Sequence, residues 1–308
     1  MSQRSVLAAS VSTRAVRRWA WATLVANTVI ILTGGLVRLT GSGLGCPTWP
    51  RCTDASYVPH QELGLHGVIE FGNRLLTYVL VAVVVGTAVA VWRWSGTSRG
   101  LRRLVVGIGL GIPFQAVIGG ITVLTDLNPW VVALHLVLSM YLVALSVWLV
   151  VRVHPRAGVA ASAGVQRLVR VVYGVAWVAV YLGTVVTGSG PHAGDEDSPR
   201  NGLSPETWSH VHAASVYLLV ALTLALWWST RSGALRRPVL VLLGVELAQG
   251  VVGLVQFWTG LPIVLVALHL VGAAALVAAA TWVVLAARGG SSEGATGETR
   301  SADQPVPA

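Results

Sequence analysis

The chain has 308 residues, of which 54% are hydrophobic and 11% charged, and its formal net charge is +9. Soluble domains carry about a quarter charged residues, so this composition excludes an ordinary soluble domain. A span of about 20 apolar residues crosses the hydrocarbon core of a bilayer, and the apolar residues here suffice for about eight such spans. We therefore expect a polytopic, all-α membrane protein.

The apolar spans are separated by short polar segments. The hydropathy pattern places eight of them at residues 20–39, 65–91, 103–124, 130–151, 168–187, 207–228, 238–258 and 262–286. The first span is long and lacks a small-x-small cleavage site, so it is interpreted as a retained helix. Residues 1–19 and 156–167 are expected to be an N-terminal arm and a linker. Residues 287–308, rich in Gly, Ser, Glu and Pro, are expected to be a disordered tail.

The basic residues indicate the topology. All 21 are arginines, and 17 of them lie in the segments on the side of both termini. The positive-inside rule therefore places both termini in the cytoplasm of a multi-pass protein of the cell membrane. The positive charge is thereby explained without nucleic-acid binding.

The chain repeats itself. FQAVIG and ALHL within residues 114–136 recur as AQGVVG and ALHL within residues 248–270, and 20 residues separate Gln from His in both copies. TGSG at residues 40–43 also recurs at 187–190. Four spans return the chain to the same side of the membrane. The sequence therefore predicts two tandem four-helix bundles, residues 20–155 and 168–286, in a pseudo-symmetric parallel repeat.

Three histidines share one depth in the predicted bundles. At a rise of about 1.5 Å per residue, His135, His212 and His269 lie about 9–10 Å below the starts of their helices. Those starts are marked by Pro129, Ser204–Pro205 and Pro262. One histidine from each of two facing helices can ligate a haem iron from both sides. His212 and His269 are the candidates for this role in the second bundle.

A polar stripe in the first bundle is expected to face His135. His66, Glu70 and Asn73 lie four and three residues apart, so they share one helical face. Aligning Tyr78 with Tyr217 brings Asn73 against the position of His212. The stripe therefore marks a second candidate site, in which His135 is the histidine of the opposite helix.

Charged residues near this stripe have two interpretations each. Glu70 beside a haem would suit proton transfer or stabilisation of developing positive charge, but it could equally form an ion pair with Arg74 at i+4. Arg38 and Arg74 lie near the outer boundary and are candidates for contacts to haem propionates or to lipid headgroups.

The two cysteines fall in one outer loop. Cys46 and Cys52 lie six residues apart, in a compartment that permits disulfides. Their spacing is compatible with a disulfide or with a reversible thiol pair. The pair could serve as a loop staple or have a redox role at the edge of a haem.

Several linked motifs together resemble the heme A synthase family. They are GGLVRLTGSGLGC at residues 34–46, IEFGNR at 69–74, LNPW at 127–130 with His135, the segment 187–195, and Gln249 with His269. The resemblance covers the chain up to its tail.

The resemblance implies an oxidoreductase that converts the C8 methyl group of heme O to a formyl group by successive hydroxylations, giving heme A for terminal oxidases. It implies a cofactor haem b between His212 and His269, and a substrate haem held by His135 beside Glu70. It also implies that Cys46 and Cys52 can form a disulfide.

One residue departs from the family pattern. The common motif reads Glu-x-x-His-Arg, and here Asn73 stands at the histidine position. The second ligand of the substrate haem is therefore His66, Asn73, or no protein residue at all.

The partners that the resemblance implies are heme O, a heme O synthase (protoheme farnesyltransferase) and an electron-transfer partner, and a homo-oligomer is left open. The main alternative function is a di-haem b-type electron-transfer cytochrome, followed by a transporter built from parallel repeats.

Overall fold

The structure is a computed structural model that describes residues 11–154 and 160–289. It confirms all eight predicted helices and the all-α class, and the described residues contain no β-strand. The helices are α1 (Thr13–Leu39), α2 (Gly64–Trp92), α3 (Arg99–Leu124), α4 (Pro129–Val153), α5 (Ala163–Ser189), α6 (Pro205–Thr230), α7 (Arg236–Trp258) and α8 (Ile263–Ala287), with a short 3₁₀ helix η1 (Gln61–Leu63) before α2.

Three helices, α1, α3 and α5, begin several residues before the apolar spans predicted for them. The reason is capping: the Ser12, Ser98 and Ser162 side chains accept backbone hydrogen bonds at the starts of α1, α3 and α5. As a result α5 begins at Ala163, inside the segment that the sequence predicts as a linker. The remainder of that segment up to residue 159, the first ten residues of the arm and the tail from residue 290 lie outside the described residues.

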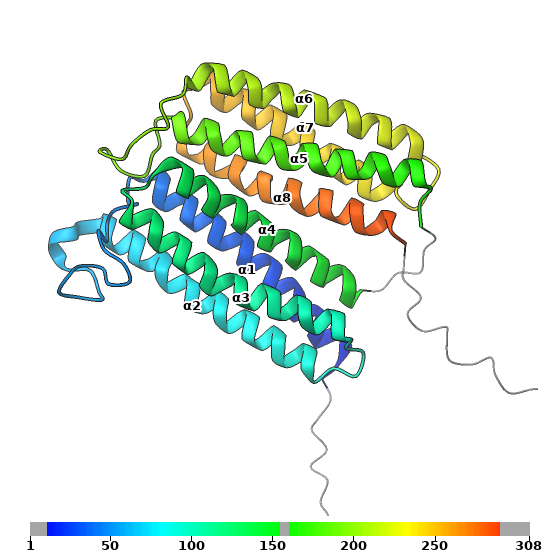
Figure 1. The fold of residues 1–308 in the computed structure, drawn as a ribbon, viewed down its shortest axis with the longest axis horizontal. Helices are drawn as coiled ribbons and strands as arrows, with labels where there is room; N and C mark the ends of the chain where they lie inside the picture. Colours follow the sequence, from blue (N-terminus) through cyan, green and yellow to red (C-terminus); the bar gives the residue numbers. More distant parts are fainter. Residues whose placement is uncertain (1–10, 155–159, 290–308) are drawn as a thin grey trace, which may run out of the picture.

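Each half of the chain arranges its four helices in a square. In the N-terminal half α1 and α3 each contact α2 and α4, and in the C-terminal half α5 and α7 each contact α6 and α8. Consequently α2 lies diagonally across from α4, and α6 diagonally across from α8. The halves lie side by side and meet where α4 and α1 contact α8 and α4 contacts α5 (Figure 1). This matching arrangement is what the sequence repeat predicts, although the repeat itself stays a prediction.

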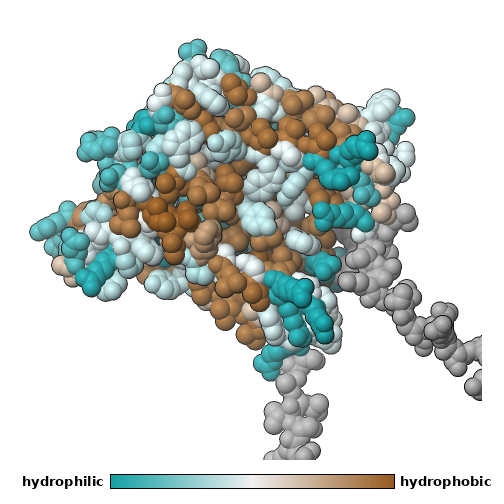
Figure 2. Space-filling view, in the orientation of Figure 1, coloured by the Kyte–Doolittle hydropathy of each residue, from teal (hydrophilic) through white to brown (hydrophobic). Residues whose placement is uncertain are grey.

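The molecule has two polar ends and an apolar middle. All eight helices are long and apolar enough to cross a membrane. Figure 2 shows hydrophobic side chains across the middle of one face and hydrophilic ones toward its ends. We call the end that carries the connections 40–63 and 190–204 the long-loop end, and the opposite end the termini end.

In α6 and α7 the buried residues are confined to the parts nearer the termini end. The buried residues of α6 all lie between Leu219 and Thr230, and those of α7 between Pro238 and Glu246. The parts of α6 and α7 nearer the long loops bury no residue. Side chains in these parts of α6 and α7 are therefore not enclosed by the packing of this half.

Candidate functional site

Two histidines face each other across the C-terminal half. His212 on α6 and His269 on α8 have ring centroids 6.4 Å apart, with ring planes at 84°. The Nδ1 of His269 is buried and has no hydrogen-bond partner among the described residues. Buried imidazole nitrogens are normally hydrogen-bonded, so this nitrogen and the ring that faces it fit a site for a bound group.

The spacing of this pair fits a metal ion held from both sides. Metal–imidazole bonds are about 2 Å long, so two trans imidazoles hold their ring centroids about 6 Å apart. The observed 6.4 Å agrees with that separation. The two nitrogen donors and the diagonal placement of their helices therefore suit a haem iron, which both histidines would bind.

A glycine on the preceding helix lies beside each of the three histidines His135, His212 and His269. A Cβ added at Gly183 would lie 3.3 Å from Cε1 of His212, one at Gly253 would lie 3.4 Å from Cε1 of His269, and one at Gly119 would lie 3.2 Å from Cε1 of His135. The sequence analysis missed these glycines as site residues. A signal was present, because Gly119 and Gly253 end the repeated motifs FQAVIG and AQGVVG.

His135 occupies the matching place in the N-terminal half. Its Nδ1 is also buried and unpartnered among the described residues. Gln115 donates from Nε2 to the His135 carbonyl at 3.1 Å and to Ser139 Oγ at 2.8 Å. The repeated glutamine thus fixes the backbone that carries the histidine in this half.

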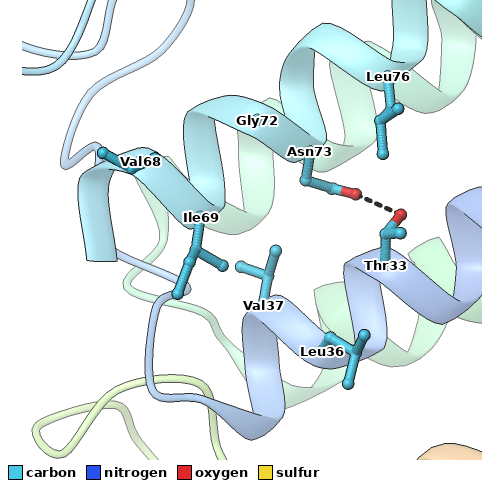
Figure 3. A pocket seen from close by; sticks show the side chains of 8 residues that line it. All are labelled: Thr33, Leu36, Val37, Val68, Ile69, Gly72, Asn73 and Leu76. Carbon is cyan, nitrogen blue, oxygen red and sulfur yellow. Dashed lines mark hydrogen bonds between the residues drawn. The ribbon is translucent and has the colours of Figure 1, made fainter. Parts of the chain in front are cut away.

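Asn73 lies in a groove between α1 and α2. The groove has a volume of about 260 Å³ and is lined mainly by apolar side chains, among them Leu36, Val68 and Leu76 (Figure 3). Thr33 donates from Oγ1 to Asn73 Oδ1 at 2.8 Å. The amide oxygen of Asn73 is therefore engaged, and its Nδ2 group is left as the donor.

His66 lies toward the long-loop end of α2. Its Nδ1 is 2.9 Å from Ser42 Oγ, in the connection that follows α1. This contact gives His66 a partner within the loop structure.

Glu70 and Arg74 form the ion pair that the sequence offered as one of two interpretations. Arg74 donates from Nε to Glu70 Oε1 at 3.1 Å and from Nη2 to the same oxygen at 2.5 Å. Glu70 Oε2 accepts from the Cys46 backbone N–H at 2.6 Å. Both carboxylate oxygens are thus bonded within the protein.

All five N–H groups of Arg74 are used in the structure. Besides Glu70, they reach the carbonyl oxygens of Thr48 at 3.0 Å, Arg51 at 3.1 Å and Cys46 at 3.0 Å. In this conformation Arg74 has no N–H left for a haem propionate.

Cys46 and Cys52 are fully buried, and their sulfur atoms lie at bonding distance, 1.99 Å. The loop between them places Trp49 against α3, because a Cβ added at Gly120 would overlap the indole ring. The loop thus lies over the long-loop end of the N-terminal half.

Arg38 links the two halves at the long-loop end. It donates from Nε to the carbonyl oxygen of His192 at 2.6 Å and from Nη2 to that of Thr187 at 3.0 Å. The backbone adds a bond from Gly43 N–H to Gly194 O at 2.7 Å. Partial burial and the charge of Arg38 together lower the pKa of His192.

One further carboxyl group is buried in the C-terminal half. Glu246 on α7 accepts from Thr223 Oγ1 on α6 at 2.8 Å, and both side chains are buried. Glu246 Oε2 has no partner among the described residues. This pair lies at the termini end, so it belongs to the packed part of the bundle.

Known proteins resemble the chain over most of its length. Residues 17–281 match the COX15-CtaA family, described as cytochrome oxidase assembly protein. A heme A synthase of Methylorubrum extorquens is 30% identical over 63% of this chain and 57% of its own length. A heme A synthase of Listeria welshimeri is 30% identical over 40% of each chain. The chain thus matches about two fifths to three fifths of these curated relatives.

Proposed function

Because the chain belongs to the COX15-CtaA family of cytochrome oxidase assembly proteins, we propose that it is a heme A synthase. The proposed reaction oxidises the C8 methyl group of heme O to a formyl group by successive hydroxylations, and the heme A produced serves terminal oxidases. The observation that carries this proposal is the facing pair His212 and His269, whose ring centroids lie 6.4 Å apart across the C-terminal half.

We assign the cofactor to the C-terminal bundle, residues 168–286. His212 and His269 would hold a haem b, which supplies one-electron redox chemistry when bound. The protein would contribute the two histidine nitrogens and the ring positions fixed beside Gly183 and Gly253.

We assign the substrate to the N-terminal bundle, residues 20–155. His135 binds the iron of heme O, and Gln115 holds the His135 backbone in place. Asn73 would take the place of a second histidine, with its amide oxygen bonded to Thr33. One protein ligand rather than two favours exchange of substrate for product. Glu70 would assist proton or charge movement at the methyl group.

The partners and orientation follow from the same proposal. Heme O would come from a protoheme farnesyltransferase, and an electron-transfer partner would act at the long-loop end. Both termini lie in the cytoplasm, because 17 of the 21 arginines lie on their side of the membrane.

The assignment is tested by replacing the substrate ligand. We expect His135→Ala to abolish heme A formation and to leave heme O in pigment extracts of membranes that express the variant. Leu134→Ala is the matched control, because Leu134 is the neighbouring residue and its side chain is exposed. Heme A in His135→Ala membranes would contradict the substrate site. Extracts of wild-type membranes that hold only unmodified haem b would indicate an electron-transfer cytochrome instead.

A further inference from the structure

The loop closed by the two cysteines, residues 46–52, is held on α2 by one side chain. We call this segment the cysteine loop. Arg74 donates to three of its carbonyl oxygens, those of Cys46, Thr48 and Arg51. These bonds connect both ends and the middle of the loop to one guanidinium, so the loop and Arg74 form one unit.

Glu70 belongs to the same unit. Its Oε1 accepts two bonds from Arg74, and its Oε2 accepts the Cys46 backbone N–H. The side chain of Glu70 is 7% exposed. Glu70 therefore cannot bond to a substrate without giving up one of these partners, and Cys46 N–H is the partner that a movement of the loop would remove.

The cysteine loop also lies next to the site assigned to the substrate. Trp49 of the loop packs on Gly120 of α3. The preceding residue, Gly119, lies beside the His135 ring, with its added Cβ 3.2 Å from Cε1. A displacement of the loop would thus uncover the end of the bundle above His135 at the same time as it frees Glu70.

We propose that Arg74 is a positioning residue that ties Glu70 to the cysteine loop, and that reduction of a Cys46–Cys52 disulfide releases Glu70 to the substrate. The inference rests on the proposed function, since it takes the N-terminal bundle as the substrate site. Closure of the loop holds the two Cα atoms 4.4 Å apart. Two separate thiols impose no such constraint, so the loop can leave α2 after reduction.

The reduction is a thiol–disulfide exchange with an external dithiol. A thiolate of the dithiol attacks one sulfur of the Cys46–Cys52 bond and forms a mixed disulfide, which its second thiol resolves. The dithiol is oxidised to a disulfide, and two electrons and two protons pass to Cys46 and Cys52. The Cys46 N–H and the three loop carbonyls then exchange their bonds to Glu70 and Arg74 for bonds to water.

The first test measures how Arg74 affects the disulfide. The full-length protein in detergent is equilibrated with mixtures of reduced and oxidised dithiothreitol, free thiols are alkylated, and the reduced fraction is read by mass. In Arg74→Lys we expect the equilibrium constant for reduction to rise about tenfold, which corresponds to about 30 mV. Lysine has three donors on a single nitrogen and cannot replace the five bonds of the guanidinium.

Arg51→Lys is the matched control. Arg51 lies in the same loop, but its side chain donates to the Asp54 carbonyl oxygen at 3.0 Å and stacks on Tyr57. Its backbone carbonyl, which accepts from Arg74, is kept in the variant. We expect the wild-type equilibrium constant in Arg51→Lys. An unchanged constant in Arg74→Lys would overturn the positioning role of Arg74.

The second test observes Glu70 itself. The infrared difference spectrum between reduced and oxidised protein should contain a carboxyl band that is absent in Glu70→Gln. In the double variant Cys46→Ser/Cys52→Ser, which cannot form the disulfide, the band should lie where it lies in the reduced wild-type protein, without any reductant. This variant keeps the test valid if Arg74→Lys does not fold. A spectrum without a carboxyl band would overturn the release of Glu70. Neither readout needs heme O, so the failure of this inference and the failure of the proposed activity are distinguishable.

Discussion

Asn73 stands at the position where the proposed substrate site would otherwise have a second histidine. His212 and His269 provide two facing imidazoles in the other half, 6.4 Å apart. Here His135 has the matching glycine beside its ring, but the diagonal helix presents an amide whose oxygen already accepts from Thr33. Under the proposed function the two sites would differ by one protein ligand, which suits one haem that stays bound and another that is exchanged.

Restoring the second histidine should convert the first site into a copy of the second. In Asn73→His reconstituted with heme O, we expect a six-coordinate low-spin iron and at least a tenfold loss of carbon monoxide affinity, because the added imidazole occupies the open position. Optical spectra of the reduced protein measure both effects. His66→Ala should leave the wild-type spectrum unchanged, since His66 is bonded to Ser42. A spectral change in His66→Ala would instead identify His66 as the second ligand.

The residues of this site could be predicted from the sequence more readily than their partners. The spacing of His66, Glu70 and Asn73 indicates a shared helical face. It contains no information about the cysteine loop, because the loop's path is set by turns and long-range contacts rather than by periodicity. The helical spacing therefore does not predict the hydrogen bond from Cys46 to Glu70 or those from Arg74 to three loop carbonyls.

At the scale of helices, the glycines beside the histidines set the position of each ring. A larger side chain at Gly183 would occupy the place of the His212 ring, since even a Cβ there would lie 3.3 Å from Cε1. We expect Gly183→Leu to lose most of the haem from the C-terminal site. The measurement is the haem-to-protein ratio after purification.

Gly174→Leu is the control for that substitution. Gly174 lies on the same helix, and a Cβ there meets no atom within 4 Å. Both variants gain about 1 kcal/mol of helix propensity, so only the crowding of the ring differs between them. Equal haem content in the two variants would show that the glycine is not required by the site.

The contact between α6 and α7 contains a buried polar pair that the other half lacks. Thr223→Val should lower the stability by about 1–3 kcal/mol, because Glu246 Oε1 loses its donor. The repeat aligns Thr223 with Val84 and Glu246 with Ile112, which are both buried. Thr223→Val/Glu246→Ile should therefore recover most of the loss. Thermal unfolding in detergent compares the single and double variants, and a double variant less stable than the single one would refute this account.

The helices themselves were predictable because apolar spans of this length have few alternatives in a bilayer. The ends of the helices were harder to predict from hydropathy, because serine caps extend α1, α3 and α5 into polar sequence. The histidine depths could be estimated correctly because Pro129 and Ser204–Pro205 do mark the starts of α4 and α6.

For the whole molecule, the sequence left open how the two halves meet. The junction consists of contacts between α1, α4, α5 and α8, with Arg38 bonded to carbonyls of the connection between α5 and α6. Such contacts pair residues about 150 positions apart, and no local pattern encodes them. They place the long loops of both halves, and thus both candidate sites, at the same end of the molecule.

The distribution of charge predicts which side of the membrane the long-loop end faces. The arginine distribution places the termini end in the cytoplasm and the long-loop end outside. We expect green fluorescent protein fused after residue 289 to fluoresce, and alkaline phosphatase inserted between residues 194 and 198 to be active. Phosphatase inserted between residues 231 and 235, in the connection on the opposite end, should be inactive and serves as the control.

The same experiment bears on the cysteines. A disulfide persists in an oxidising compartment and is reduced by the thiol systems of the cytoplasm. If the long-loop end faces outside, the Cys46–Cys52 bond is stable until a specific dithiol reaches it, as the release of Glu70 requires. The opposite orientation would keep both cysteines reduced, and Glu70 would then be free at all times. Fusions that report the reversed topology would therefore contradict both the charge prediction and a regulated release of Glu70.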